Sequence, residues 1–213
     1  MIRAQLLAFF VALAGTAGLV PIFIGLSRRF GVMDLPDARK VHTHPMARWG
    51  GGAIAGGVFL GLGSVSLLVP WFAKLLNFHY QVFEKGQTVG VLSLRAQFTG
   101  VLIGAIVCVV LGMWDDRKSL PPVVKLLTQI IAAYVAMIYG VRMAGLAIPG
   151  FGFVTFPLLV SQIVTLFWLL GFMNAINLTD GLDGLAGGIC AIAAGTFLFV
   201  ALLQSDTKIL LYS

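Results

Sequence analysis

Residues 98–114 read Phe-Thr-Gly-Val-Leu-Ile-Gly-Ala-Ile-Val-Cys-Val-Val-Leu-Gly-Met-Trp, and the next two residues are Asp115 and Asp116. The stretch has no charged side chain, and its length approaches the roughly 20 apolar residues that a helix needs to cross a membrane. Lipid offers the backbone no hydrogen-bonding partner, so a stretch of this kind must be helical. The segment therefore predicts a transmembrane helix that ends in two adjacent carboxylates.

The composition extends this prediction to the whole chain. Of 213 residues, 59% are hydrophobic and 10% are charged, and the mean hydropathy is +1.00. Soluble domains carry about 45–50% apolar and about 25% charged residues, so an ordinary soluble domain is excluded. The net charge of +6 comes mostly from basic residues between apolar runs, which indicates membrane topology and no nucleic-acid partner.

We predict an all-α fold, a polytopic transmembrane helix bundle that forms a single membrane domain over residues 1–213, with about six spans plus the start of a seventh. A signal peptide is the alternative for the first span, but its apolar run exceeds the usual 7–15 residues or so. A new apolar run begins at Ile209 and stops at Ser213, so we expect a truncated chain or gene fragment. The predicted spans are Ala4–Leu26, Gly51–Phe72, Phe98–Trp114, Val123–Tyr139, Leu158–Met173 and Leu185–Gln204.

Two patterns add detail to this bundle. The loops after the first and third spans, with Lys125 just beyond, hold eight of the 14 Lys and Arg residues, which places loops one, three and five in the cytoplasm. Glycines recur at spacings that allow two helices to pack closely. They are Gly52, Gly56, Gly57 and Gly61 in the second span, Gly100 and Gly104 in the third, and Gly184, Gly187 and Gly188 at the start of the sixth.

Six of the eight acidic residues occur as three pairs, and all three pairs fall in loops on the same predicted face of the membrane. A single topology thus gathers most of the carboxylates on one side, which predicts a shared site there. The pairs are Asp34 with Asp37, Asp115 with Asp116, and Asp180 with Asp183.

The pair Asp115–Asp116 is a candidate metal site, because Mg²⁺ is usually held by one or two carboxylates together with substrate phosphates. The alternative is a solvated turn in which Arg117 and Lys118 are the counter-ions. The basic residues of the first loop, Lys40 and Arg48 among them, are candidates for neutralising phosphates. Anchoring at the lipid headgroups is the alternative for that loop.

The end of the fifth span is polar as well. If the helix continues past Met173, Asn174, Asn177 and possibly Asp180 share one face. Two Asp-Gly steps, at Asp180 and Asp183, indicate a turn whose backbone can approach a ligand closely. These groups could bind a nucleobase or ribose and a metal, whereas helix capping explains one or two of them. Cations, paired carboxylates and amides at a membrane surface together suit phosphoryl transfer.

These three segments resemble the polyprenyl-phosphate N-acetylhexosamine-1-phosphate transferases (glycosyl transferase family 4), and the WecA/TagO-type branch more than the phospho-MurNAc-pentapeptide transferase. The first segment is similar to the family's first-loop signature, the second to its Asp-Asp motif and the third to its Asn-Asp motif. They are Asp34-x-Pro36-x-x-Arg39-Lys40-x-His42-x-x-Pro45-x-x-Arg48-x-Gly50-Gly51, Asp115-Asp116 with Leu120, Lys125 and Gln129, and Asn174-x-x-Asn177-x-x-Asp180-Gly181-x-Asp183-Gly184-Leu185-Ala186.

The resemblance implies a reaction in which a UDP-sugar, such as UDP-GlcNAc, donates its sugar-1-phosphate to a polyprenyl phosphate such as undecaprenyl phosphate, releasing UMP. It implies Mg²⁺ (or Mn²⁺) as cofactor, a cytoplasmic-facing site in the bacterial inner membrane, and a role in lipopolysaccharide, teichoic acid or other cell-wall synthesis. The implied roles are catalysis by Asp115 and Asp116, with Asp115 as the base; metal binding by Asp116, Asp180 and Asp183; nucleotide binding by Asn174, Asn177, Asp180 and Asp183; and phosphate binding by Lys40, Arg48 and Lys125.

Some family features are missing from the sequence. The family usually has more spans than the six predicted, a further metal-binding Asp in a Gly-Asp-x-Gly-Ser type motif, and a His-rich cytoplasmic loop. The alternatives that stay open are an inactive truncated fragment, a cation- or proton-coupled transporter and a CDP-alcohol phosphotransferase. Surrounding lipids are expected partners, and a homodimer is a possible assembly.

Overall fold

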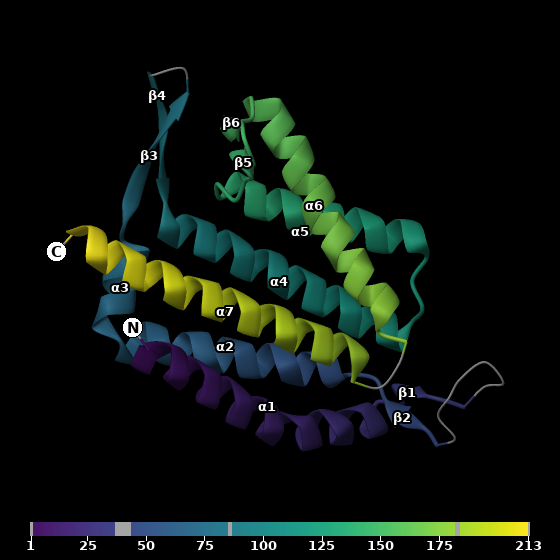
Figure 1. Ribbon diagram of the computed structural model, residues 1–213. Coiled ribbons are helices and arrows are strands. Elements are labelled where there is room, and N and C mark those ends of the chain that lie inside the picture. The colour runs from purple at the N-terminus through teal and green to yellow at the C-terminus, as the bar shows by residue number, and fades with distance from the viewer. Residues whose placement is uncertain (1, 37–43, 85–86, 182–183, 213) are drawn as a thin grey trace. The chain divides into compact units, whose positions relative to one another are not determined.

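The computed structural model describes residues 2–36, 44–84, 87–181 and 184–212, which form helices linked by loops and three hairpins (Figure 1). The chain divides into two compact units, Met1–Leu166 and Phe167–Ser213, and each is described by itself. The helices are α1 (Ile2–Arg29), α2 (Gly50–Leu68), α3 (Pro70–Leu76), α4 (Leu94–Arg117), α5 (Pro122–Ile138), α6 (Leu158–Thr179) and α7 (Leu185–Tyr212).

The prediction of a helical membrane protein is confirmed in part. Within the described residues, four helices are long and apolar enough to cross a membrane, namely α1, α2, α4 and α6. The other two predicted spans correspond to shorter apolar helices, Pro122–Ile138 and Leu185–Val200. The predicted start of a seventh span is wrong, because α7 continues through the polar residues Asp206 and Lys208 as one helix to Tyr212.

The predicted second span, Gly51–Phe72, is two helices rather than one. Val69 has an extended backbone (φ −115°, ψ 96°) and separates α2 from α3, which begins at Pro70. Proline disfavours the helical conformation of the residue before it, yet its fixed φ suits the first turn of a new helix. The predicted span is therefore interrupted just before Pro70, where a second helix begins.

Helices α1 and α2 lie side by side along the glycines of α2 (Figure 1). A Cβ atom at Gly57 would overlap Thr16 Oγ1, and one at Gly61 would lie 2.6 Å from the carbonyl oxygen of Ala8. Two backbones can approach this closely only where a side chain is missing. The predicted packing role of these glycines is confirmed in α2.

The pair α4 and α5 packs in the same way. A Cβ atom at Gly100 would lie 2.5 Å from Cβ of Tyr139, and one at Gly104 would lie 3.0 Å from the carbonyl oxygen of Ala132. In unit 2, by contrast, a Cβ atom at Gly187 or Gly188 would meet no described atom within 4 Å. The glycines at the start of α7 therefore do not show the predicted close packing among the described residues.

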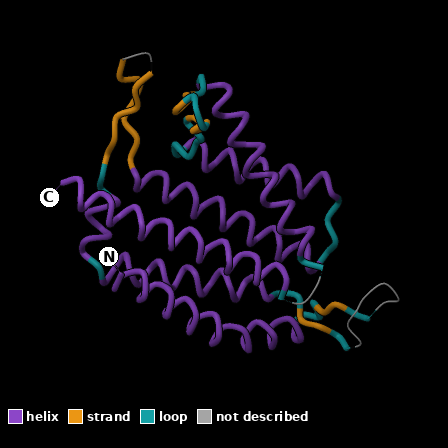
Figure 2. Tube along the Cα trace, viewed as in Figure 1, coloured by secondary structure: helices purple, strands orange, loops and turns teal. Residues whose placement is uncertain are grey.

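Three antiparallel hairpins, which an all-α prediction does not include, lie at the ends of the helices (Figure 2). In unit 1, β1 and β2 lie where α1 ends and α2 begins, whereas β3 and β4 connect α3 to α4 at the opposite end. We call these the β1–β2 end and the β3–β4 end. The strands are β1 (Met33–Asp34), β2 (Met46–Ala47), β3 (His79–Glu84), β4 (Gln87–Ser93), β5 (Gly145–Ile148) and β6 (Gly152–Thr155).

Candidate active site

The two carboxylates Asp115 and Asp116 lie in the last turn of α4. The end of the apolar run had predicted a loop position for them, and this prediction is wrong. The helix continues to Arg117 because polar residues are compatible with an exposed terminal turn. The backbone N–H of Lys118 closes this turn by donating to the carbonyl oxygen of Trp114 at 2.9 Å. The rigid end of α4 therefore positions both carboxylates at the β1–β2 end of unit 1.

The Asp115 carboxylate is held by two donors, one from the loop after α4 and one from α5. Its Oδ1 accepts the backbone N–H of Leu120 at 2.8 Å, and its Oδ2 lies 2.6 Å from Nζ of Lys125 on α5. Both donors stabilise a negative charge on the carboxylate. Lys125, predicted to bind phosphate, therefore lies beside a predicted catalytic group and partly neutralises it.

Arg48 links the first loop to the end of α4. Its guanidinium lies 2.6 Å from Oδ1 of Asp34 on β1 and donates to the main-chain carbonyl oxygen of Asp116 at 3.4 Å. The carbonyl groups of a last helical turn have no partner within the helix, and a cation there also interacts favourably with the helix dipole. The structure thus brings the first and second predicted segments together, with Arg48 between them.

Trp49 is a site residue that the sequence reasoning missed. Its indole N–H donates to the carbonyl oxygen of Met113 at 3.1 Å, its ring packs on Phe30 at 5.7 Å between centroids, and it is 9% exposed. Its backbone N–H donates to Oγ of the buried Ser27 at 3.4 Å. The signal in the sequence was an aromatic residue directly between Arg48 and the two glycines that begin α2.

A cavity of about 460 Å³ lies beside this helix end and is lined by Trp49, Met113, Trp114, Arg117 and Lys118. The sequence suggested Arg117 and Lys118 as counter-ions of the adjacent carboxylates. In the part of the chain that the structure describes, however, neither side chain has a hydrogen-bonding or ion-pair partner. The cavity therefore presents two cations beside two aromatic rings.

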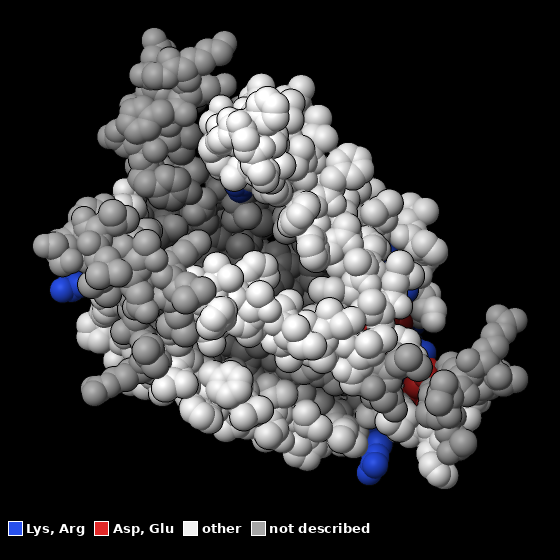
Figure 3. Space-filling model, in the orientation of Figure 1, with Lys and Arg blue, Asp and Glu red and all other residues white. Residues whose placement is uncertain are grey.

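Charged side chains are unevenly distributed over the molecule. On the face shown in Figure 3, the visible carboxylates gather near β1 and β2, together with basic side chains, and most of the remaining surface is uncharged. This distribution follows from the apolar sequence of the helices. It leaves the helix ends as the place where polar chemistry can occur.

Unit 2 contains the third predicted segment. Helix α6 does continue past Met173, so Asn174 and Asn177 lie at i, i+3 on one exposed face, and Asp180 directly follows the helix. The Asn174 side-chain amide donates to the carbonyl oxygen of Leu170 at 2.8 Å. The shared face expected for these residues is therefore present within this unit.

Several predicted residues lie outside the described part of the chain. They are Lys40, which was predicted to bind phosphate, and Asp37 and Asp183, each of which belongs to one of the three acidic pairs.

The described residues test the predicted magnesium site only in part. No group of three His, Cys, Asp or Glu side chains gathers among them. Oxygen ligands from one or two carboxylates nevertheless suffice for Mg²⁺ when substrate phosphates complete its coordination. The carboxylate of Asp116 fits this role by its chemistry and its place at a helix end.

Known proteins resemble the chain in sequence. The family model described as "Glycosyl transferase family 4" matches residues 98–213, a region that includes Asp115, Asp116 and the third predicted segment. No solved structure matches.

Curated relatives cover most of the chain. A probable undecaprenyl-phosphate N-acetylglucosaminyl 1-phosphate transferase of Bacillus subtilis is 32% identical over 100% of the chain and 52% of the relative. A phospho-N-acetylmuramoyl-pentapeptide-transferase of Streptococcus uberis is 31% identical over 97% of the chain and 60% of the relative. A decaprenyl-phosphate N-acetylglucosaminephosphotransferase of Mycolicibacterium smegmatis is 35% identical over 79% and 38%, respectively.

The chain spans about half the length of the curated relatives it matches. The family model nevertheless aligns with more than half of the chain. The matched region includes the end of α4, with Asp115 and Asp116, and the end of α6, which Asp180 follows. The chain therefore belongs to glycosyl transferase family 4.

Proposed function

We propose that this protein transfers an N-acetylhexosamine-1-phosphate, specifically GlcNAc-1-phosphate, from its UDP-sugar to undecaprenyl phosphate at the cytoplasmic face of a bacterial inner membrane. The names of the Bacillus and Mycolicibacterium relatives support the choice of sugar, and the name of the Bacillus relative supports the choice of lipid. The product is a lipid-linked sugar diphosphate of the kind from which cell-envelope glycans are built.

One observation carries this proposal. The Asp115–Asp116 pair stands at the end of a membrane-length helix, where Lys125 pairs with Asp115 and Arg48 contacts the main chain of Asp116. A phosphoryl-transfer site needs little covalent chemistry from the protein; it needs fixed charges that position two anionic substrates. A carboxylate pair held between two basic side chains at the lipid boundary meets that need.

The reaction joins an oxygen of the lipid phosphate to the phosphorus that carries the sugar. The bond between that phosphorus and the oxygen bridging to the uridine phosphate breaks, so that UMP leaves. We assign Asp115 as the base that accepts any proton of the lipid phosphate, while Lys125 keeps its carboxylate oriented. Arg117 and Lys118 directly follow the pair in the sequence. We assign them to holding the lipid phosphate at the membrane surface.

The other assignments rest on membership of the family. Asp116 would hold Mg²⁺, which neutralises phosphate charge when bound, and we assign metal binding to Asp180 and Asp183 as well. Asn174 and Asn177 present amide groups on one face of α6 and would contact the uridine, with Asp180. Lys40 and Arg48 remain phosphate-binding assignments, and Arg48 also fixes the first loop against α4.

The test is UMP release in membranes that contain the 213-residue chain, supplied with UDP-GlcNAc, undecaprenyl phosphate and Mg²⁺. We expect release that requires both the lipid phosphate and the metal. Asp115→Asn and Asp116→Asn should each abolish it without lowering the amount of inserted protein. Glu84→Gln, on β3 at the opposite end of unit 1, is the matched control and should leave release unchanged.

A second readout separates the two carboxylates. Loss of a metal ligand raises the Mg²⁺ concentration needed for half-maximal UDP-GlcNAc binding, so Asp116→Asn should shift this midpoint and Asp115→Asn should not. Absence of UMP release and of metal-dependent UDP-GlcNAc binding in the unsubstituted chain would contradict the proposed function.

A further inference from the structure

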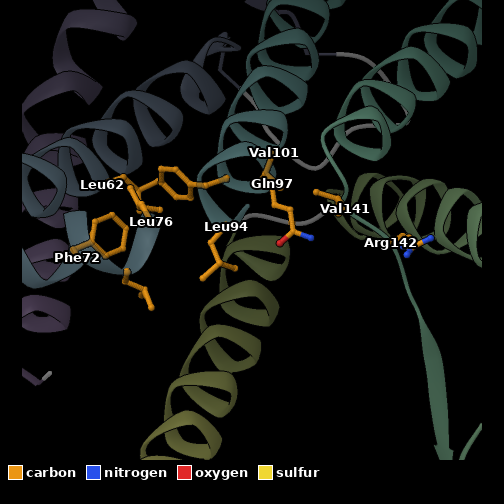
Figure 4. A pocket seen from close by; sticks show the side chains of 10 residues that line it. Leu62, Phe72, Leu76, Leu94, Gln97, Val101, Val141 and Arg142 are labelled. Atoms are coloured by element: carbon orange, nitrogen blue, oxygen red, sulfur yellow. The ribbon is translucent and has the colours of Figure 1, made fainter. Parts of the chain in front are cut away.

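A second cavity, of about 500 Å³, opens in unit 1 at the β3–β4 end (Figure 4). Its walls come from the end of α2, from α3, from the start of α4 and from the loop that follows α5. Gln97 lines it from α4, and a helical rise of about 1.5 Å per residue places Gln97 roughly 27 Å from Asp115 along this helix. The cavity is therefore separate from the candidate active site.

The lining of this cavity is polar on one side only. Figure 4 shows Leu62, Phe72 and Leu94 on one side of the view, with Gln97 and Arg142 displaced to the other. The Gln97 side-chain amide donates to the carbonyl oxygen of Gly140 at 2.7 Å and so holds the loop that carries Arg142. An apolar wall next to a fixed cation is the lining that an anionic amphiphile requires.

Arg142 is the charged group of the cavity, and it is half-buried. Among the residues that the structure describes, no carboxylate or carbonyl group binds its guanidinium. Removing part of the water from a charge is costly unless another group pairs with it. A phosphodiester is a suitable partner, because guanidinium groups bind phosphate oxygens through two parallel hydrogen bonds.

The position of the cavity agrees with such a partner. It lies where α2 ends and α4 begins, and both helices are long and apolar enough to span a membrane. Helix ends of this kind lie at the level of the lipid headgroups. A cation there faces phosphate groups, while Leu62 and Val101, located further along their helices, face acyl chains.

We propose that this cavity binds one anionic glycerophospholipid of the bilayer, with its phosphodiester on Arg142 and an acyl chain along Leu62, Phe72 and Leu94. A free phosphate ion would leave the apolar wall exposed, and an uncharged lipid would leave Arg142 unpaired. The site lies on the membrane face opposite the candidate active site and does not depend on the proposed transferase activity.

The test uses the full chain in detergent micelles, titrated with palmitoyl-oleoyl-phosphatidylglycerol, with bound lipid counted by native mass spectrometry. We expect one tightly bound lipid. Arg142→Gln should weaken its binding at least about tenfold, the loss expected for a hydrogen bond between charged partners. Arg142→Lys, which keeps the charge, should retain most of the affinity and shows that position 142 tolerates substitution.

Arg95→Gln is the matched control, because Arg95 stands at the same end of unit 1 at the start of α4 but is exposed and does not line the cavity. It should bind the lipid as the unsubstituted chain does. Equal weakening by Arg95→Gln and Arg142→Gln would overturn the proposal, since it would indicate diffuse attraction to surface charge. Binding of palmitoyl-oleoyl-glycerol as tight as that of the phospholipid would overturn it as well. Detection of the chain as a dimer with no lipid bound would also overturn it.

Discussion

Nζ of Lys125 on α5 lies 2.6 Å from Oδ2 of Asp115 at the end of α4. The two side chains are 38% and 27% exposed, so this ion pair contributes at most about 1 kcal/mol to folding. Its more important consequence is geometric, because the ammonium and the Leu120 N–H together fix both oxygens of a carboxylate that we place in catalysis.

Substitution of Lys125 should therefore affect the reaction more than the stability. We expect Lys125→Gln to lower UMP release about tenfold, because the Asp115 carboxylate loses the contact that orients it and a misplaced catalytic group reacts more slowly. The thermal midpoint in detergent should change little. Lys74→Gln, a lysine on α3 away from the pair, is the control; equal activity of both variants would exclude Lys125 from the site.

The indole of Trp49 supports the same helix end by a different contact. Trp49→Phe keeps a ring against Phe30 but removes the N–H that donates to the carbonyl oxygen of Met113. The loss should lower the free energy of unfolding by about 1 kcal/mol, the net value of a typical hydrogen bond. Thermal unfolding in detergent measures this loss.

Trp71→Phe is the comparison for this substitution, because Trp71 on α3 is 44% exposed. It should leave the unfolding midpoint nearly unchanged. If the two variants unfold at the same temperature, the Trp49 hydrogen bond adds nothing to the stability of this end of unit 1.

Glycine packing between α1 and α2 gives a prediction about stability alone. A methyl group at position 57 overlaps Thr16 Oγ1 and lies 2.7 Å from the carbonyl oxygen of Ala12, which belongs to the backbone and cannot rotate away. Gly57→Ala should therefore separate the two helices and destabilise the protein by about 1–3 kcal/mol.

Gly63→Ala in the same helix is the matched control, since a methyl group there meets no atom within 4 Å. Alanine is the better helix former by up to about 1 kcal/mol, so this variant should unfold at the same temperature or higher. Destabilisation by both substitutions to the same extent would mean that loss of glycine, rather than helix contact, is the cause.

Hydropathy and composition predicted the helices of this protein because each apolar run is long and has few charges. The same criterion ended the third span at Trp114, three residues before the helix ends at Arg117, since a helix does not stop where its apolar run does. The hairpins were not predicted because hydropathy reports only apolar runs, although Lys85-Gly86 between two strand-like segments is a turn signal.

The site was predicted only as residue types that share one face. Asp115 and Lys125 were both identified, but that they pair depends on the angle at which α5 leaves α4. The contact between Arg48 and Asp34 depends on the register of β1 with β2, in which Asp34 is opposite Met46. No local pattern fixes such a register, so this contact could not be predicted, and the assignment of Arg48 to phosphate stays a prediction.

Arg117 and Lys118 give the last prediction, because they line a cavity with two tryptophans and have no ion-pair partner in the described part of the chain. If they bind the lipid phosphate equally strongly in the ground state and in the transition state, their removal weakens binding without changing the chemical step. The double variant Arg117→Gln, Lys118→Gln should raise KM for undecaprenyl phosphate about tenfold and leave kcat within about twofold. The control Lys74→Gln, Arg95→Gln removes two charges at the β3–β4 end and should change neither value. A fall in kcat at unchanged KM would instead assign the two cations to the transition state, and the lipid phosphate would then have to be bound elsewhere.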